Sequence, residues 1–465
     1  MKFSGASVED ATAIRRVSQL VKRRLRHRPV VIVSALAKVT DQLLKAGKTA
    51  VEGSLRAACE TVEQLRRRHQ AVARELVEKE QYDCLWAELE PGFDQLDCLL
   101  EEIASEGAFP SPAQDRLLGM GEWFSSKILQ AALWRTGLDV TWVDATACIV
   151  TDAAHTRAMP LWQETYARLE AVLLPLLHLG QIPVLGGFVG ATQDGIPTTL
   201  GRGGSNFSAA IVGAGLQASR IEIWTDVDGV MTTDPKLCPE ARRVTRLSFG
   251  EAAELAYFGL QVLHPAMLTP AMQRNIPVWV LNSRSLEKGG TEITAKVSDG
   301  GKVKAIAAKR GITVVDVEPV NWFGRELSRK VFEVFDRHQH GLELLTASHG
   351  SLSLVVSATA DLAAISRELE GSARLRWEKQ KALVCLVGEQ IRRRPEIASQ
   401  ALHAISDIDL RMMCQGASER SITFLVDDSR AEEAVRRLHD LLFAVPARPE
   451  SELSPSMSQT LGGTC

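Results

Sequence analysis

Short runs of β-branched and apolar residues recur along the chain, and longer segments with helical periodicity separate them. The runs are VVIVSA (30–35), VTWVDA (140–145), IPVLGGFV (182–189), IEIWTDV (221–227) and IPVWVL (276–281). Continuous apolar runs of this length are typical of strands that are buried on both faces of a sheet. Their alternation with helical segments, such as 9–26 and 250–257, predicts an α/β fold with a largely parallel central sheet.

The segment between about residues 43 and 106 has a different pattern. It is rich in Glu, Arg, Leu and Ala and contains no strand signal, so it predicts a helical insertion. Its charge runs, RRRHQ and EKEQ, are expected to lie on a solvated helix face, with a docking surface as the alternative.

A polar, Gly-rich stretch follows Asn282, and two similar blocks come after it. Each block has the order strand, helix, strand, over 305–357 in the first and 382–427 in the second. This repetition predicts a first domain over 1–297 and two α+β modules in tandem, over 298–372 and 373–445. Residues 446–465 are rich in Ser, Pro, Gly and Thr without periodicity, so we expect a disordered tail.

Composition and charge exclude several classes of protein. The 465 residues are 45% hydrophobic and 24% charged, which is typical of a folded globular chain. The formal net charge of −3 provides no general attraction for nucleic acid or an anionic membrane. The uncharged stretch 171–193 is interrupted by Pro175 and Pro183, so we expect a buried core segment there and no membrane span.

The N-terminus and the cysteines indicate a cytoplasmic protein. No apolar segment long enough for a signal peptide follows Met1 before Glu9. The eight cysteines include no C-x-x-C pair and no His/Cys cluster at zinc spacing, so we expect reduced thiols and no metal centre built by protein ligands.

The strongest chemical signal is the segment PTTLGRGGSNFSAA, which begins at Pro197. Its glycines allow backbone N–H groups to approach a ligand closely, and Ser205 is placed to cap the Ala-rich helix that follows. Arg202 adds a guanidinium, and such a turn at a helix N-terminus binds anions. The pattern is neither a Walker loop nor a G-x-G-x-x-G motif. The alternative is an ordinary strand-to-helix turn with an exposed arginine.

Three further segments favour one shared phosphate crevice. Lys2 precedes a Gly-containing turn at 2–7, and 34–40 places hydroxyls and Lys38 after a buried strand, where open α/β sheets bind ligands. The segment TDVDGVMTTDPK (225–236) follows another strand and offers groups that suit a nucleotide. The alternatives are an exposed N-terminal lysine and an Asx-rich surface loop.

Eight motifs in this order resemble the aspartate kinases of the amino acid kinase superfamily. They are KFSGASV (2–8), VVIVSALAKVTDQLL, MGEWFSS, VTWVDA with Thr151 and Asp152, TTLGRGGSNFSAA, TDVDGVMTTDP, EAAELAYFGLQVLHP and the C-terminal modules. The resemblance implies phosphorylation of the L-aspartate β-carboxylate by ATP and Mg²⁺, which gives 4-phospho-L-aspartate and opens lysine, methionine and threonine synthesis. It also implies that the two modules are ACT domains that bind an amino acid effector and form a homodimer.

The resemblance also implies the roles of individual residues. Catalytic roles fall to Lys2, Arg202 and Asn206. Contacts with aspartate fall to Ser34, Thr40, Glu122, Arg202 and Ser205. Contacts with the nucleotide fall to Lys2, Gly5, Ser7, Gly203, Gly204, Thr225, Asp226, Met231, Lys236 and Gln261.

Several positions depart from the family pattern. Ser4 and Ala6 stand where glycine and threonine are usual, Asn206 replaces an aspartate and Gln261 replaces a lysine. Loss of one orienting or electrostatic group commonly costs about 10²- to 10³-fold in rate, so we expect slower catalysis. In the first module Glu326, Glu343 and His349 alter the pocket that binds lysine in relatives, which predicts weak lysine feedback.

Two other functions stay open at this point. A catalytically weak paralogue that senses amino acids as a regulatory subunit would explain Asn206 and Gln261. A superfamily kinase for another carboxylate or a carbamate would explain the phosphate turns, although Glu122 and the paired ACT modules argue against it.

Overall fold

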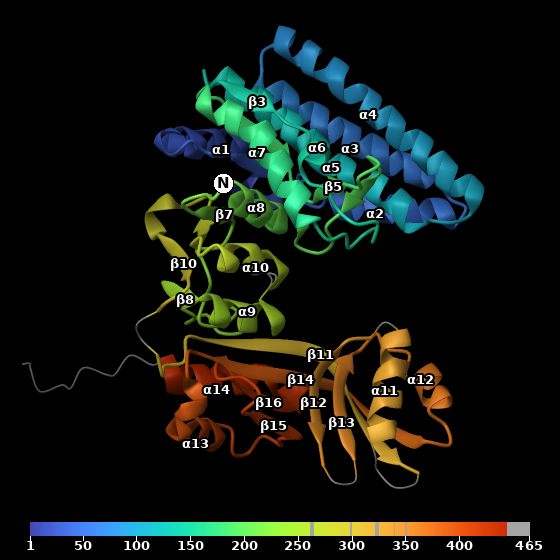
Figure 1. Ribbon diagram of the computed structural model, residues 1–465, viewed down its shortest axis with the longest axis vertical. Helices are drawn as coiled ribbons and strands as arrows, with labels where there is room; N and C mark the ends of the chain where they lie inside the picture. The colour runs from blue at the N-terminus through green and yellow to red at the C-terminus, as the bar shows by residue number, and fades with distance from the viewer. Residues whose placement is uncertain (261–264, 298–299, 321–324, 339, 349–350, 444–465) are drawn as a thin grey trace, which may run out of the picture.

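The computed structural model describes all of the 465 residues except 261–264, 298–299, 321–324, 339, 349–350 and 444–465. Gln261, His349 and the expected tail at 446–465 therefore lie outside the described residues, as does the Glu326 side chain. The chain forms two large sheets, each with its own helices, which lie at opposite ends of the long axis (Figure 1). The predicted α/β class is confirmed.

The first sheet has eight strands in the order β3-β4-β2-β1-β7-β9-β10-β8. Their bounds are β1 Lys2–Phe3, β2 Val31–Val33, β3 Val140–Trp142, β4 Ile182–Gly186, β7 Ile221–Thr225, β8 Arg246–Ser248, β9 Val278–Asn282 and β10 Gly290–Thr294. Neighbours are parallel except β9 and β10, which are antiparallel. All five predicted strands form within a few residues of their expected bounds, and a two-stranded sheet of β5 (Val189–Ala191) and β6 (Pro197–Thr199) lies beside them.

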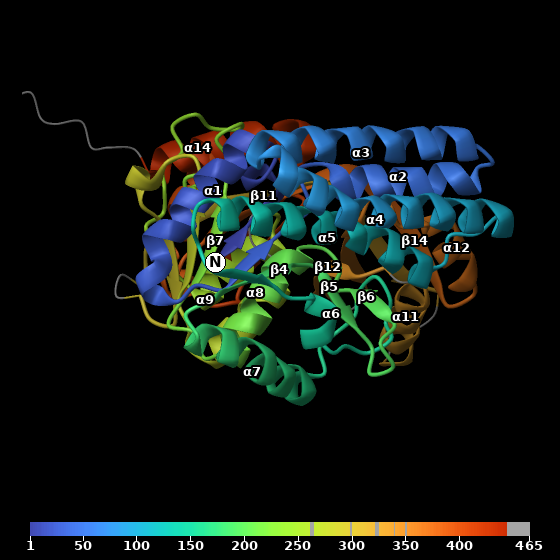
Figure 2. The ribbon, with the colours of Figure 1, turned by 90° about the horizontal axis from the view of Figure 1, so that it is seen from above.

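Helices cover both faces of this sheet and make a three-layer sandwich (Figure 2). One layer contains α1 (Ala11–Arg24), α2 (Val39–Val51), α3 (Leu55–Leu76), α4 (Lys79–Glu106) and α5 (Ser111–Arg135). The other contains α6 (Ala145–Cys148), α7 (Trp162–His178), α8 (Gly204–Gly215), α9 (Phe249–Tyr257) and α10 (Pro265–Gln273). Strand residues alternate between the two cores: Val31 and Val33 pack with the first layer, and Ile32 packs with the second.

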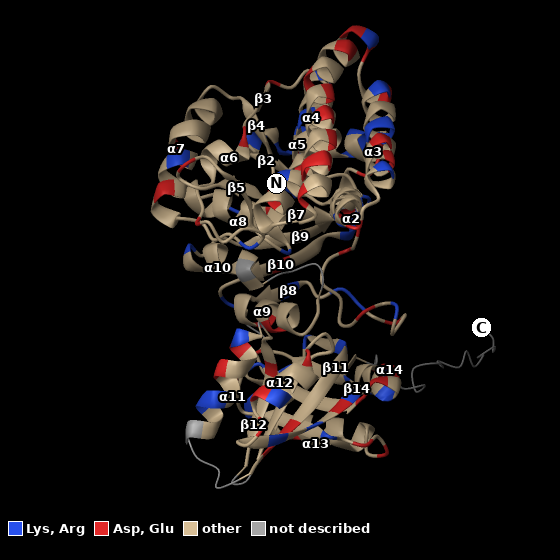
Figure 3. Cartoon of the chain, turned by 90° about the vertical axis from the view of Figure 1, so that its right-hand side faces the viewer, with Lys and Arg blue, Asp and Glu red and all other residues tan. Residues whose placement is uncertain are grey.

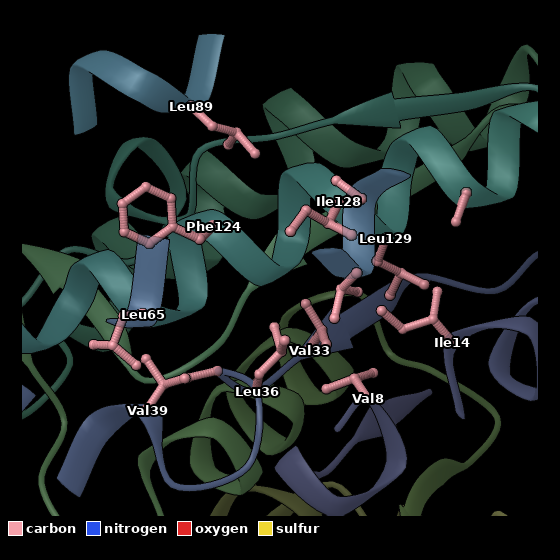
Figure 4. Packing of buried hydrophobic residues seen from close by; sticks show 14 of the residues in the cluster. Val8, Ile14, Val33, Leu36, Val39, Leu65, Leu89, Phe124, Ile128 and Leu129 are labelled. Atoms are coloured by element: carbon pink, nitrogen blue, oxygen red, sulfur yellow. The ribbon is translucent and has the colours of Figure 1, made fainter. Parts of the chain in front are cut away.

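The segment predicted as a helical insertion is helical, formed by most of α2 together with α3 and α4. Its buried residues Leu65 and Leu89 belong to the same core as Val33 and Phe124 (Figure 4). Gly92 of α4 has no room for a side chain, because an added Cβ would lie 2.8 Å from the Trp123 ring. The insertion is therefore part of the main core.

Charged residues recur along α3 and α4 (Figure 3). Arg66 of α3 bridges to Asp94 and Asp97 of α4, with Nη–Oδ distances of 3.1 and 2.9 Å. In the run RRRHQ, Arg67 is exposed but His69 is buried, so the solvated-face prediction is wrong for part of this run. In the run EKEQ, residues 78–80 are exposed, as predicted.

The second sheet is antiparallel and has six strands in the order β12-β13-β11-β14-β16-β15. Their bounds are β11 Ala305–Pro319, β12 Leu342–Ala347, β13 Leu352–Ser357, β14 Ala373–Val387, β15 Met412–Gln415 and β16 Ser421–Asp427. Its helices are α11 (Arg325–Arg337), α12 (Leu362–Glu368), α13 (Pro395–Ala404) and α14 (Ala431–Phe443). Single 3-10 turns occur at η1 (Gly5–Ser7), η2 (Leu25–His27), η3 (Leu286–Lys288), η4 (Ile391–Arg393) and η5 (Asp428–Arg430).

The two α+β modules interleave within this sheet, and the expectation of a simple tandem order is wrong in this respect. The long strands β11 and β14 pair with each other along both modules. Ile306 at the start of β11 packs in the core with α13 and α14, whereas Val315 packs with α11 and α12. The second module thus takes its first strand from the chain before the first module, a pairing that no local pattern reveals.

Helix α9 joins the first sheet to the second. Ser248 and Glu251 form a capping box at its start, and the other oxygen of Glu251 accepts a hydrogen bond from the Glu389 N–H at 2.8 Å. At its end, the Tyr257 hydroxyl donates to the carbonyl of Glu343 at 2.9 Å. The helix is therefore held at both ends by the second sheet.

The uncharged stretch 171–193 forms the end of α7, the buried strand β4 and the whole of β5. None of the helices in the described ranges is sufficiently long and apolar to cross a membrane. The expected core segment is confirmed, since β4 is buried throughout.

We predict that the aromatic contact between the insertion and α5 is important for stability. Phe93 of α4 is fully buried, and its ring centroid lies 4.0 Å from that of Phe124. Phe93→Ala should lower the free energy of unfolding by about 3–5 kcal/mol, measured by urea denaturation. The matched control is Phe332→Ala, whose side chain is 41% exposed, and this variant should change stability little. Equal effects of the two variants would contradict this account of the core.

Candidate active site

The strands β1, β2, β4 and β7 are mutually parallel neighbours, so their carboxyl ends meet at one edge of the sheet. The predicted Gly-containing turn at 2–7 follows β1 and the predicted hydroxyl-bearing turn at 34–40 follows β2 at this edge. Gly5 lies so close to the second turn that an added Cβ would be 2.9 Å from the Ala35 carbonyl oxygen. The two turns therefore lie against each other, at the edge where the shared crevice was expected.

Lys2 and Glu122 are buried side chains that interact with each other beside these turns. Lys2 lies on β1 and is 5% exposed, so the alternative of a solvated terminal lysine is wrong. Burial lowers the pKa of Lys2 to about 8, and the attraction of Glu122 opposes this shift. Burial raises the pKa of Glu122 to about 7, against the opposing effects of the Ala35 backbone, Lys2 and Ser205. These two groups provide a cation and an anion with little solvent around them.

The predicted anion turn connects β6 to α8 and faces Glu122. The Ser205 hydroxyl, at the start of α8, lies 3.4 Å from Glu122 Oε1. Gly203 is the N-cap residue in a left-handed conformation, with φ of 74°. Gly204 is required at its position because an added Cβ would lie 2.6 Å from the Phe188 ring. The N–H groups at the start of α8 are therefore close to the buried Glu122.

Arg202 and Asn206 flank this turn. Arg202 is exposed, and no described residue forms an ion pair with it, so its guanidinium is available to a ligand. Asn206 is half-buried in the first turn of α8. Both positions agree with the expected placement at the crevice.

The predicted hydroxyl residues have different surroundings. Ser34 and Thr40 are half-buried around the turn between β2 and α2. Ser7 is 1% exposed, and its hydroxyl donates to the Trp224 carbonyl at 3.2 Å and to Ser283 Oγ at 2.9 Å. Its N–H donates to the Ser4 carbonyl. The polar groups of Ser7 are thus used within the protein, where they join β1 to β7 and β9.

A cavity of about 620 Å³ lies beside the carboxyl end of β7. Its lining includes three of the predicted nucleotide residues, Asp226, Met231 and Lys236, whereas Thr225 is not part of it. Asn282 also lines it and donates to Asp228 Oδ1 at 2.6 Å. The Asx-rich segment therefore borders a cavity large enough for a small ligand.

Residues 305–308 at the start of β11 form another wall of this cavity, which their sequence did not predict. Their apolar pattern indicates a strand but carries no chemical signal. Asn282 was also missed, although its polar side chain at the carboxyl end of β9 is a recognisable signal. Within the described ranges, no three His, Cys, Asp or Glu side chains are grouped to hold a metal ion.

Comparison with known proteins gives concordant results. Residues 1–282 match the amino acid kinase family and residues 384–442 match an ACT domain. The chain is 32% identical over 453 residues to lysine-sensitive aspartokinase 3 of Escherichia coli (strain K12), covering 95% of this chain and 98% of that protein. It is also 32% identical over 467 residues to chloroplastic aspartokinase 1 of Arabidopsis thaliana, covering 95% of this chain and 80% of the relative.

Solved structures show the same relationship. The crystal structure of E. coli aspartokinase III in complex with aspartate and ADP (R-state) has a TM-score of 0.86 at 31% identity, covering 95% of this chain and 99% of that one. The same enzyme in complex with lysine and aspartate (T-state) has a TM-score of 0.78 at 32% identity, covering 95% and 98%. In sequence and in structure, the chain therefore belongs to the aspartokinases of the amino acid kinase family and carries ACT modules at its C-terminal end.

Proposed function

We propose that the protein transfers the γ-phosphoryl group of ATP to the β-carboxylate of L-aspartate and forms 4-phospho-L-aspartate. The observation that carries this proposal is the buried pair of Lys2 and Glu122, which lies beside a Gly-rich turn at the edge of the parallel sheet. A related aspartokinase binds aspartate and ADP, which supports both substrates. The reaction would open lysine, methionine and threonine synthesis.

The chemistry requires charge and position more than a general base. A carboxylate is already an anionic nucleophile, so the protein must bring it in line with the phosphate and stabilise the charge that develops. We assign the contact with the transferred phosphoryl group to Lys2, and phosphate contacts to Gly5 and the N–H groups of Gly203 and Gly204. Ser7 stabilises the first turn in this scheme, because its polar groups are already used within the protein.

The substrate aspartate carries two carboxylates and one ammonium. Arg202 would hold a carboxylate and Glu122 would accept from the ammonium, with Ser34, Thr40 and Ser205 as hydroxyl donors. Arg202 is exposed and Glu122 is buried, so the two groups would bind different parts of the ligand.

The nucleotide would occupy the cavity of about 620 Å³ with its base near Met231 and Lys236. Asp228, which lines the cavity, is already paired with Lys288, which fits an ion held largely by the nucleotide phosphates. Bound Mg²⁺ would neutralise phosphate charge there.

We further propose a kinase domain over 1–297 followed by two interleaved ACT modules over 298–445, in which the start of β11 belongs to the second module, and a homodimer formed through the modules. The ACT modules would bind an amino acid effector. Glu343 supports a pocket unlike that of lysine-sensitive relatives, since its carboxylate already pairs with Lys309 Nζ at 2.6 Å. A cytoplasmic location is consistent with the free thiols of all seven cysteines in the described ranges.

Lys2→Met tests the central assignment. It keeps the length and burial of the side chain but removes the charge, so kcat should fall by roughly 10²- to 10³-fold. ADP release and aspartyl hydroxamate formation measure the rate, and the melting temperature reports folding. Lys48→Met on the exposed side of α2 is the matched control and should keep full activity. A folded Lys2→Met variant with a kcat close to that of the wild type would refute the assignment.

The pKa of Glu122 predicts a pH dependence of substrate binding. Because this pKa is raised to about 7, the carboxylate that binds ammonium predominates only above that pH. KM for L-aspartate should fall several-fold as pH rises from about 6 to about 8. Proton loss from Lys2, with its pKa lowered to about 8, should reduce kcat at higher pH.

Glu122→Gln should raise KM and abolish this pH dependence of KM, whereas Glu52→Gln on the exposed end of α2 should leave it unchanged. The ammonium of free aspartate stays protonated throughout this range, so it does not contribute. A KM that does not vary with pH in the wild type would contradict the proposed contact.

Asn206 and Gln261 generate a separate prediction about rate. An aspartate at 206 and a lysine at 261 would form a charge pair beside the phosphates, and each alone would introduce an unbalanced charge. We expect a low kcat/KM in the wild type. The gain in transition-state stabilisation from Asn206→Asp with Gln261→Lys should exceed the sum of the two single gains by at least about 1 kcal/mol. Additive effects on kcat/KM would show that the two positions act independently.

A further inference from the structure

Asp115 is a buried carboxylate that the catalytic scheme above does not use. It lies in the first turns of α5 and is 1% exposed. The His155 Nδ1–H donates to its Oδ2 at 2.7 Å, and Thr199 Oγ1 donates to its Oδ1 at 2.5 Å. The Thr156 N–H donates to both oxygens, at 3.0 and 3.1 Å. A buried carboxylate is tolerated only when it is satisfied in this way.

The partners of Asp115 come from two segments that are distant in sequence. His155 and Thr156 lie in the loop between the bridged residues Thr151 and Pro160, and Thr199 is the last residue of β6. The two segments are also joined directly, because the Ala158 N–H donates to the Thr199 carbonyl at 2.9 Å. Asp115 therefore anchors the loop and the strand to the same helix.

Thr156 adopts a conformation that a β-branched residue rarely takes. Its φ is 67°, in the left-handed region, where the branched side chain crowds the backbone. The two hydrogen bonds from its N–H to Asp115 hold it there. Backbone strain of this kind persists only where the surroundings enforce it, and it is concentrated at functional sites.

The strained loop packs against the anion turn. An added Cβ on Gly201 would lie 3.1 Å from the Thr156 carbonyl oxygen and 3.5 Å from the Arg157 Cα. Gly201 directly precedes Arg202, so the position of Thr156 limits where the backbone of Arg202 can lie. The loop is thus one wall of the turn that presents Arg202.

Helix α5 contacts the anion turn on both sides of Arg202. Asp115 accepts from Thr199 before the turn, and Glu122 accepts from Ser205 after it. The two acidic residues are two helical turns apart, about 10 Å along the axis, and so lie on the same face. The segment 199–205, with Arg202 near its centre, is therefore attached twice to one rigid element.

We propose that Asp115 is a positioning residue for substrate binding: through Thr156 and Thr199 it holds the turn that presents Arg202 to L-aspartate. The proposal rests on the function proposed above for Arg202 and Glu122. Among the described residues, the hydrogen-bond partners of Asp115 are not part of the nucleotide-cavity lining, so we expect its effect on the amino acid substrate.

Asp115→Asn is the first test, with steady-state kinetics for each substrate. The amide keeps the size of the side chain but replaces one acceptor by an NH₂ donor that faces other donors. KM for L-aspartate should rise roughly 10- to 100-fold, as for other residues that orient a ligand-binding group. KM for Mg-ATP should stay within about twofold. Asp139→Asn, on an exposed residue, is the matched control and should behave as the wild type.

Thr156→Gly supplies a rescue that a purely structural role would not show. Glycine adopts positive φ without crowding, so the loop should need less support from Asp115. In the double variant Asp115→Asn with Thr156→Gly, KM for L-aspartate should be at least tenfold lower than in Asp115→Asn alone. Equal increases in the KM values for L-aspartate and Mg-ATP, together with a lowered melting temperature and no rescue, would overturn the proposal.

Hydrogen exchange measured by mass spectrometry separates this proposal from the proposed activity. In Asp115→Asn the peptide over 199–205 should exchange several-fold faster, whereas peptides of α7 should not change. If the wild type releases no ADP with aspartate but the peptide responds, the activity is wrong and the anchoring of the turn stands. If exchange over 199–205 is unchanged, the positioning role is wrong whatever the activity.

Discussion

Burial of Lys2 and Glu122 is the constraint on which the site depends. Removal of water opposes the charge of each group, and this is the largest cause of both pKa shifts. The charges persist together because they attract each other and because Ala35 and Ser205 contribute hydrogen bonds to Glu122. Such a pair responds strongly to a phosphate or an ammonium, since little water is present to screen it.

The rigidity around this pair comes from a strand and a helix and not from loops. Lys2 lies within the sheet, between β2 and β7, and Glu122 lies within a helix of 25 residues. The glycines of the two turns have close neighbours of their own, since an added Cβ would meet Ala35 at Gly5, Thr156 at Gly201 and Phe188 at Gly204. Binding groups carried by regular elements keep their geometry better than groups on loops alone.

The two halves of the molecule share more than a linker. Residues 305–308 line the cavity beside β7, and the same strand continues through both modules of the second sheet. Helix α9 is held at its first residues by Glu389 and at its last by the Glu343 carbonyl. A displacement of the second sheet would therefore change the wall of the cavity directly.

Local pattern determined much of this protein from the sequence alone. Strand runs such as 221–227, the helical insertion and the Gly-rich turn before Ser205 were predictable because period, β-branching and glycine act over a few neighbouring residues. The meeting of the turns after β1 and β2 was also predictable, since parallel strands end at one edge.

Only the tertiary structure decided which distant groups meet. Three features join residues that are far apart in the chain. They are the hydrogen bond from Ser7 to Trp224, the interleaved strand β11 and the hydrogen bond from Thr156 to Asp115. Ser7 shows the difference: its motif indicated a phosphate contact, yet its hydroxyl is used by β7 and β9. The reason is physical, because burial and hydrogen-bond partners depend on how the strands are ordered in the sheet, and local sequence does not encode that order.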